Sequence, residues 1–263
     1  MSKRFLIGFI VGLALIVVVG AGFRLNQNDG QQERSRTELA EYQAEMRDAS
    51  PVRLGVLTPK QRYHSKLHNG SVGDMGGTTI SQLIAAYRGQ RIVLGRSIDG
   101  RMWLPSGDPQ APEDYFGALA KESDAIIRGR AVSKVSQITE DDSFLFTDYE
   151  LVVSEVFKNN AISPLDNGTS ITITCAGGKI IVDEVVVKAG GNGEALLPVG
   201  AQDVLLFLKF IAETGSYRLT RYNGGFELNG KTVTPLAGIF PIKPNIFNNE
   251  RSFLKLVRAV SNK

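Results

Sequence analysis

The sequence predicts a mainly β protein with flanking helices (α+β), preceded by one N-terminal transmembrane helix. Three observations lead to this fold class. The segment Phe5–Phe23 is apolar throughout, residues 37–122 show helical periodicity, and from Ala125 onward short apolar runs alternate with turn residues. About seven such runs follow one another, which is typical of a small β-barrel or β-sandwich.

The first element is the apolar segment Phe5–Phe23, which carries no charged side chain. Nineteen residues in a helix span ~28 Å, close to the hydrocarbon thickness of a bilayer. Its length favours a retained signal anchor over a signal peptide, although the small residues around Ala21 also fit a cleavage site. Lys3 and Arg4 hold the short tail in the cytoplasm, so the bulk of the chain is expected outside it.

The composition divides the rest of the chain into four further regions. Residues 1–23 are the anchor, 24–36 a polar linker, 37–122 a helical and irregular region, 123–240 a β-barrel-like domain, and 241–263 a C-terminal helix that packs on the domain. Caps and apolar stripes predict the helices. They are Thr37–Ala49, a helix opened by Thr58-Pro59 and closed at Asn69-Gly70, Thr79–Arg88, Pro112–Glu122 and Asn249–Val260.

The predicted strands are bounded by turn residues. The strongest turn signal is Asn229-Gly230, a two-residue hairpin turn. A short hairpin is also expected in residues 91–104, around Asp99-Gly100. The strands of the β domain are Ala125–Ile138, Phe144–Phe157, Ser170–Thr174, Lys179–Lys188, Asp203–Ile211, Tyr217–Tyr222 and the pair Gly225–Leu228 and Lys231–Thr234.

Charge and cysteine content exclude some classes of function. The formal net charge is +3, and residues 124–263 hold 15 basic and 15 acidic side chains. A nucleic-acid binder would carry a basic patch, so no nucleic-acid partner is expected. Cys175 is the only cysteine, so no intramolecular disulfide can form. Its place at the end of a predicted strand, with no basic neighbour before Lys179, favours a structural thiol over a nucleophile.

Two histidines are the candidate metal ligands. His64 and His68 are four residues apart on a predicted helix, a spacing that places both imidazoles on one face, as zinc sites require. Residue 65 is Ser rather than the Glu of helical zinc proteases, and the chain has no third histidine. The simpler interpretation is two polar surface histidines. The sequence assigns no catalytic residue and no cofactor.

Five aromatic side chains are candidates for a ligand-binding face, because barrel proteins stack ligands on such rings. They are Phe144, Phe146, Tyr149, Tyr217 and Tyr222. Core packing is the simpler interpretation of the same residues. The run Gly225–Thr232 matches the phosphate-binding pattern G-x-x-x-x-G-K-[ST], but it continues as strand into Pro235 and is therefore interpreted as a hairpin.

The β region resembles a family of uncharacterised exported bacterial β-domains. The resemblance rests on Ser123–Val132, on Phe146–Leu151 with Glu155–Asn159, and on Pro198–Gly200 with Val204–Lys209. It covers about residues 115–235. In shape that family is similar to OB-like barrels and netrin-like inhibitor barrels. The resemblance implies a small barrel and export. It implies no catalytic residues, and it implies no inhibitor function because the N-terminal cysteines of netrin-like inhibitors are missing here.

These observations predict a membrane-anchored extracytoplasmic β-domain. We expect a non-enzymatic binding or interaction module of the bacterial envelope, held by Phe5–Phe23, with an envelope protein or a glycan as its partner. Two alternatives remain open. One is a metal-dependent envelope enzyme that uses His64 and His68. The other is a structural assembly protein that pairs through its N-terminal helices.

Overall fold

The computed structural model describes residues 40–52, 55–69, 78–87, 91–94, 111–190, 197–200, 202–237, 242 and 244–262. The predicted anchor Phe5–Phe23, the linker and the hairpin around Asp99-Gly100 lie outside these residues. Within the described ranges, no helix combines the length and apolarity that crossing a membrane requires.

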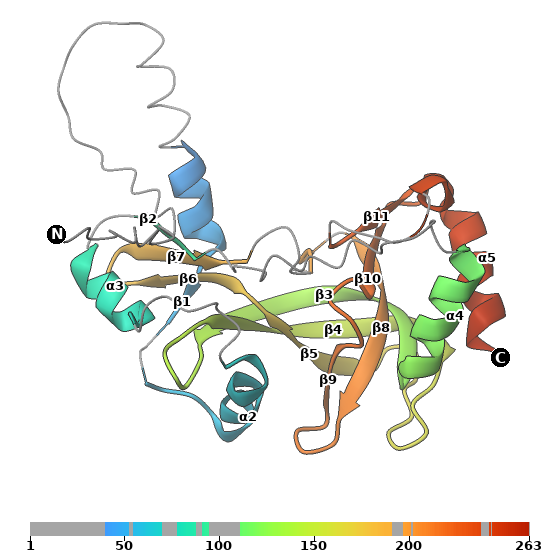
Figure 1. The fold of residues 1–263 in the computed structure, drawn as a ribbon, viewed down its shortest axis with the longest axis horizontal. Coiled ribbons are helices and arrows are strands. Elements are labelled where there is room, and N and C mark those ends of the chain that lie inside the picture. Colours follow the sequence, from blue (N-terminus) through green and yellow to red (C-terminus); the bar gives the residue numbers. More distant parts are fainter. Residues whose placement is uncertain are drawn as a thin grey trace, which may run out of the picture.

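The described chain is mainly β, as predicted, with eleven strands in two sheets (Figure 1). The larger sheet has the order β11-β10-β8-β3-β4-β5-β9 and the smaller one β1-β6-β7-β2. The strands are β1 Ser50–Pro51, β2 Arg91–Leu94, β3 Ala125–Ile138, β4 Leu145–Lys158, β5 Ser170–Ala176, β6 Gly178–Val182, β7 Val185–Ala189, β8 Asp203–Ile211, β9 Ser216–Leu219, β10 Gly225–Leu228 and β11 Val233–Pro235.

Five strands of the larger sheet close into a ring. Strand β8 pairs with β3 on one side and with β9 on the other, while β9 also pairs with β5. The ring order is therefore β3-β4-β5-β9-β8, and β5–β9 is its one parallel pair. Because side chains alternate along a strand, each ring strand has an inward and an outward row of side chains. The inward row of β5 includes Ile171, Ile173 and Cys175, which pack in the ring interior.

The smaller sheet corrects one prediction. The run Lys179–Lys188 is two strands, β6 and β7, joined by a tight turn at Asp183 and Glu184. Both turn residues have positive φ, 48° and 65°, a conformation that the sequence does not signal because neither residue is glycine. Strands β1 and β2 add to this hairpin in parallel, β1 beside β6 and β2 beside β7. The region before residue 123 therefore contributes strands to the β body.

The helices agree well with the predictions. They are α2 Pro59–His68, α3 Ile80–Ala86, α4 Pro112–Glu122 and α5 Glu250–Ser261, with a 3-10 turn η1 at Pro244–Asn248 and a helix over residues 40–48. Thr58 caps α2 as expected: its hydroxyl accepts from the Gln61 backbone N–H, and the Gln61 side chain accepts from the Thr58 N–H. At α5 the Asn249 side chain is the cap and accepts a hydrogen bond from the Ser252 backbone N–H.

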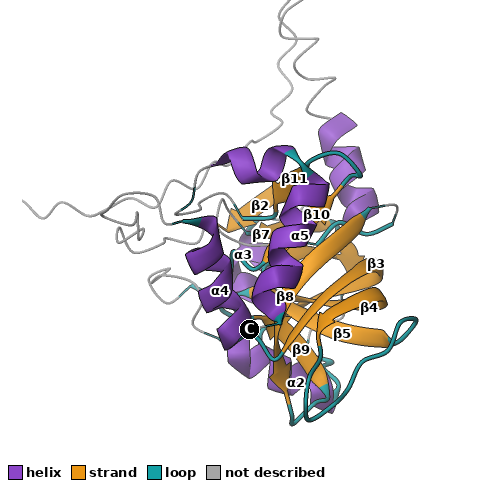
Figure 2. Cartoon of the chain, turned by 90° about the vertical axis from the view of Figure 1, so that its right-hand side faces the viewer, coloured by secondary structure: helices purple, strands orange, loops and turns teal. Residues whose placement is uncertain are grey.

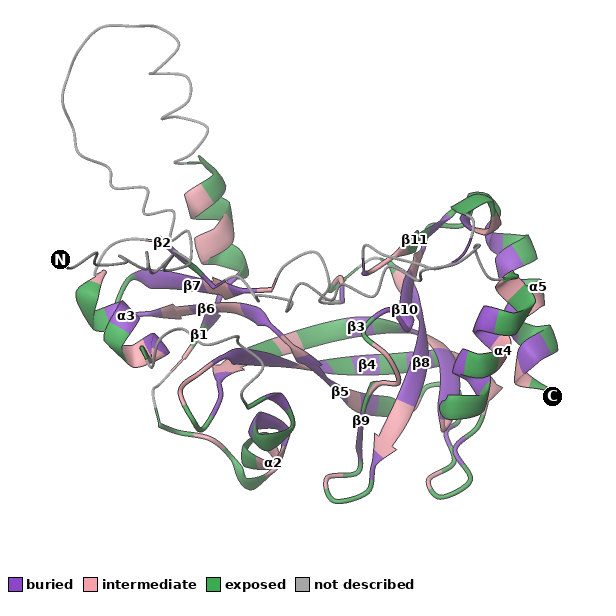
Figure 3. Ribbon diagram, viewed as in Figure 1, coloured by how far each residue is buried: buried purple, intermediate pink, exposed green. Residues whose placement is uncertain are grey.

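Three apolar clusters form the core, seen as the buried segments of Figure 3. One fills the ring. A second lies between the smaller sheet and α3. The third joins the larger sheet to α4 and α5, which lie side by side in Figure 2 and meet through the rings of Phe116, Phe207, Phe226 and Phe253. No residue of α2 belongs to any of the three clusters as described.

Candidate functional site

Helix α2 lies against the outward side of β4 and β5. Because Ile171, Ile173 and Cys175 point into the ring, the alternation of β5 turns Thr172 and Thr174 outward. On the neighbouring strand β4, Asp148 pairs directly with Thr174, so both side chains lie on the same face. This outward face is therefore polar where α2 covers it.

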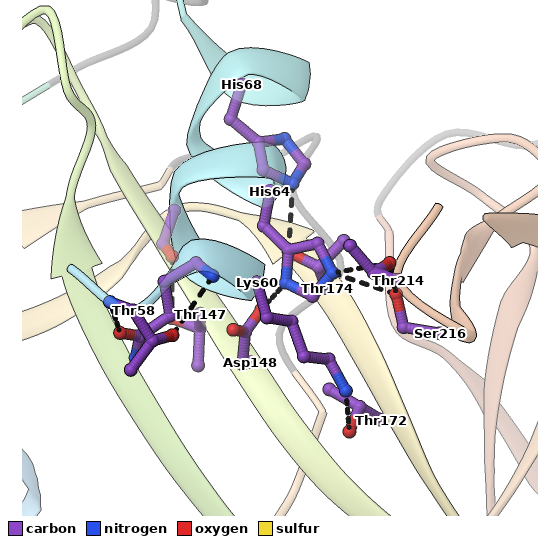
Figure 4. A network of polar contacts seen from close by, with 12 residues as sticks. Thr58, Lys60, His64, His68, Thr147, Asp148, Thr172, Thr174, Thr214 and Ser216 are labelled. Carbon is purple, nitrogen blue, oxygen red and sulfur yellow. Dashed lines mark hydrogen bonds and ion pairs between the residues drawn. The ribbon is translucent and has the colours of Figure 1, made fainter. Parts of the chain in front are cut away.

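The helix meets this face with one row of basic and imidazole side chains. Lys60, His64 and His68 are spaced by four residues, which aligns them along one side of α2. The Lys60 ammonium donates to the Thr172 hydroxyl at 2.9 Å. The His68 Nε2 lies 3.1 Å from the Thr174 hydroxyl (Figure 4). The His68 ring also stacks on Phe146, with 6.0 Å between centroids.

His64 is the centre of the network. Its Nδ1 lies 2.8 Å from Asp148 Oδ1, and its Nε2 lies 2.8 Å from Ser216 Oγ and 3.2 Å from Thr214 Oγ1 (Figure 4). His64 and Ser216 are completely buried, and the Asp148 side chain is 14% exposed. A neutral imidazole with its proton on Nδ1 donates to Asp148 and accepts from Ser216, so both ring nitrogens are satisfied.

The array carboxylate–imidazole–hydroxyl has the connectivity of a serine hydrolase triad. Such a site also needs space for a carbonyl group beside the hydroxyl oxygen, with donors for the developing oxyanion. Ser216 has no exposed surface. Moving α2 aside would not open the site, because α2 itself carries His64. In the observed arrangement the array fastens α2 to the ring.

Two further contacts extend this fastening. The Ser65 hydroxyl accepts from the Glu140 backbone N–H at 2.5 Å, which ties α2 to the turn between β3 and β4. A hydrogen bond to Glu213 raises the pKa of Tyr63, and Glu213 precedes Thr214 in the β8–β9 turn. Helix α2 therefore bridges three parts of the ring: the β3–β4 turn, the β4–β5 face and the β8–β9 turn.

The interpretation of His64 and His68 as surface residues is wrong, since both are buried. Three imidazole nitrogens lie within hydrogen-bond distance of side chains on the β strands: Nδ1 and Nε2 of His64 and Nε2 of His68. The described part of the chain contains no group of three or more His, Cys, Asp or Glu side chains suited to a metal ion. The geometry thus gives the metal-enzyme alternative no support.

Four of the five candidate aromatics are buried. Phe144, Phe146, Tyr149 and Tyr217 are at most 2% exposed, and Tyr149 and Tyr217 fill the ring interior. The core-packing interpretation is confirmed for Phe144, Tyr149 and Tyr217, whereas Phe146 is buried between β4 and the His68 ring of α2. Tyr222 alone is exposed, at 52%, and lies beyond the end of β9.

Cys175 is a structural thiol, as predicted. It is buried in the ring interior, and burial raises its pKa to about 12, with the negative charge of Asp148 adding to the effect. The thiol is therefore protonated and unreactive at neutral pH.

No sequence pattern marks Asp148 and Ser216 as partners of His64. They are 84 and 152 positions away, and neither belongs to a recognisable motif. The one local hint is Asp148 itself, an acidic residue between Phe146 and Tyr149 near the start of β4.

Comparison with protein-family models and with curated protein sequences finds no match for this chain. The fold and the site therefore define a class of structure: a mainly β domain with a five-stranded ring, covered on one face by a helix that polar side chains hold in place.

Proposed function

We propose that this chain is a membrane-anchored extracytoplasmic binding module of the bacterial envelope. The proposal is supported by the apolar segment Phe5–Phe23, which precedes a polar linker and a β body. The closed five-stranded ring agrees with the OB-like shape that the sequence resemblance implies. Barrels of this kind host many unrelated functions, so the argument for binding depends on the site.

The observation that carries the proposal is the polar outward face of β4 and β5. Strand faces that are covered by a helix are ordinarily apolar, because apolar burial stabilises the packing. Here the covered positions include Asp148, Thr172 and Thr174, which form hydrogen bonds with side chains of α2, beside one apolar ring, Phe146. A carboxylate beside several hydroxyls is a surface built to recognise cationic and hydrogen-bonding groups of a partner.

Photo-crosslinking in the membrane tests the binding proposal. A crosslinking residue is placed at Val135, which pairs with Asp148 and is 43% exposed on the same face, and at Ile162, a loop position that is 79% exposed. We expect an adduct with an envelope protein or glycan at Val135 and not at Ile162. Equal adducts at both sites, or none at Val135, would contradict a binding face here.

The anchor and its orientation have a separate test. Removal of residues 1–23 is expected to release the chain from the membrane fraction, and protease added to intact spheroplasts is expected to digest the β domain of the full chain. A β domain that stays protected until the membrane is broken would overturn the extracytoplasmic placement. Intact mass of the mature protein distinguishes a retained anchor from cleavage near Ala21.

A structural assembly role is the alternative in which the N-terminal helices carry the partner contact. The same crosslinker placed at Ala44, exposed on the helix over residues 40–48, distinguishes the two proposals. Adducts at Ala44 and none at Val135 favour assembly.

A second candidate function, hydrolysis of an ester or amide by Ser216, is favoured by the two 2.8 Å contacts of His64 with Asp148 and Ser216. The burial of Ser216 opposes it. A fluorophosphonate probe, which labels reactive serine hydroxyls, tests whether Ser216 is a nucleophile, with Ser216→Ala as the control. We expect no labelling of the native chain. Labelling that is lost in Ser216→Ala would establish the hydrolase.

A further inference from the structure

The polarity of α2 is inverted relative to an ordinary surface helix. An amphipathic helix buries its apolar stripe and exposes its polar side. In α2 the buried side chains are His64, Ser65 and His68, whereas Leu67 is 40% exposed. The apolar clusters described above contain no α2 residue. Hydrogen bonds and one aromatic stack therefore hold the helix against the ring.

This kind of attachment is weak compared with the core of the ring. A protein hydrogen bond replaces bonds to water, so a neutral one contributes a factor of only about five to an equilibrium constant, and the bond of His64 to the Asp148 carboxylate about thirty. The ring strands, by contrast, share the apolar cluster around Tyr149 and Tyr217 and are paired by backbone hydrogen bonds all round. Elements with few apolar contacts open locally, at a lower free energy than global unfolding.

We infer that α2 is a displaceable cover over a binding face of the ring, formed by Asp148, Thr172 and Thr174 with the β8–β9 turn. The inference rests on the proposed binding function and names its ligand. The face now holds an ammonium group and two imidazoles at helical spacing, contributed by Lys60, His64 and His68. It therefore fits a helical segment of another envelope protein that presents Lys, Arg or His side chains four residues apart.

Thiol reactivity measures whether α2 opens without unfolding the ring. Thr174 is 1% exposed under His68, and Cys175 beside it points into the ring. One full-length variant carries Thr174→Cys in a Cys175→Ala background, and the native chain with Cys175 is the control. We expect the outward thiol to react with a thiol reagent at least a hundredfold faster than Cys175, with no change of rate in low urea.

The same variant tests the ligand class. Adding Lys60→Ala, His64→Ala and His68→Ala is expected to raise the reaction rate of the outward thiol at least tenfold. A synthetic peptide of residues 56–70, at about millimolar concentration to match a tethered segment, is then expected to slow that reaction at least fivefold. A peptide with alanine in place of Lys60, His64 and His68, which keeps Arg62 and Lys66, is expected to leave the reaction rate unchanged. Circular dichroism and urea unfolding verify that each variant is folded.

The outcomes separate the claims. If the outward thiol is protected as strongly as Cys175, the displaceable cover is overturned, while photo-crosslinking at Val135 still decides the binding proposal. If the thiol is reactive but neither peptide slows it, or both do so equally, recognition of a basic helical segment is overturned. Crosslinking of a glycan at Val135, with no protection by the peptide, would replace the protein partner with a glycan.

Discussion

Replacing His64 with alanine is expected to lower the free energy of unfolding by about 2.5 kcal/mol. The bond from Nδ1 to the Asp148 carboxylate involves a charged acceptor and contributes about 2 kcal/mol, and the bond between Nε2 and Ser216 contributes about 1 kcal/mol. Alanine favours the helix over histidine by roughly 0.5 kcal/mol, which offsets part of the loss. Thr214 and Ser216 remain 2.5 Å apart and satisfy each other.

Urea unfolding of the full chain in detergent, followed by circular dichroism, measures this change. Two substitutions on the same helix serve as controls. Lys60→Ala removes one hydrogen bond and is expected to cost about 1 kcal/mol. Leu67→Ala removes a side chain outside the apolar clusters and is expected to change stability by less than about 0.5 kcal/mol. A His64→Ala effect no larger than that of Leu67→Ala would refute the claim that the array fastens α2.

Three further outcomes are expected. Gly129→Ala places a Cβ 2.4 Å from Leu151 Cδ2 and 2.6 Å from the Val152 carbonyl oxygen, so it is expected to lower the free energy of unfolding by about 3 kcal/mol. Gly117→Ala adds a Cβ in open space on α4 and is expected to raise that free energy by about 1 kcal/mol, which urea unfolding of both variants measures. Cys175, with its pKa raised to about 12, is expected to be inert to a thiol reagent at pH 8 in the native chain and to react fully in urea. Burial acts to raise the pKa of Asp124, but hydrogen bonds from Lys209 and the Phe210 N–H outweigh it and lower the pKa. The stabilisation from Asp124 is then present above its unfolded pKa of about 4 and lost as the pH falls through the folded pKa, so Asp124→Asn is expected to flatten the acid decline in unfolding free energy.

Most elements of the fold were predictable because their signals are local. Thr58-Pro59 marks the start of α2, Pro112 the first turn of α4, and Asn229-Gly230 the β10–β11 connection. The predicted bounds of β3 and β8 agree with the structure. In each case the deciding residues lie within a few positions of the feature that they specify.

The features that were missed depend on residues far apart in the chain. The parallel pairing of β1 with β6 joins Ser50 to Ile180, and neither short run carries a pattern that names its partner. The turn at Asp183 and Glu184 uses a backbone conformation that favours glycine. Because neither residue is glycine, the sequence does not indicate that β6 ends and β7 begins there.

The candidate site was less predictable than the fold. Its helix and the spacing of His64 and His68 could be predicted, but their burial could not, because it depends on Asp148, Thr174 and Ser216 on other strands. Polar side chains on a helix predict a solvated face unless something buries them. Here the ring supplies partners for that polar face, which reverses the usual interpretation of the pattern.

The aromatic cluster under α4 and α5 also sets an order of events during synthesis. Phe116 of α4 is made early, but Phe253 of α5 follows it by 137 positions, with all of the ring strands in between. Phe207 and Phe226 of the sheet cover part of Phe116 earlier, but the side of α4 that contacts Phe253 stays uncovered until α5 has emerged. Until then this apolar surface is open to chaperones, and α5 is the element whose arrival ends their access.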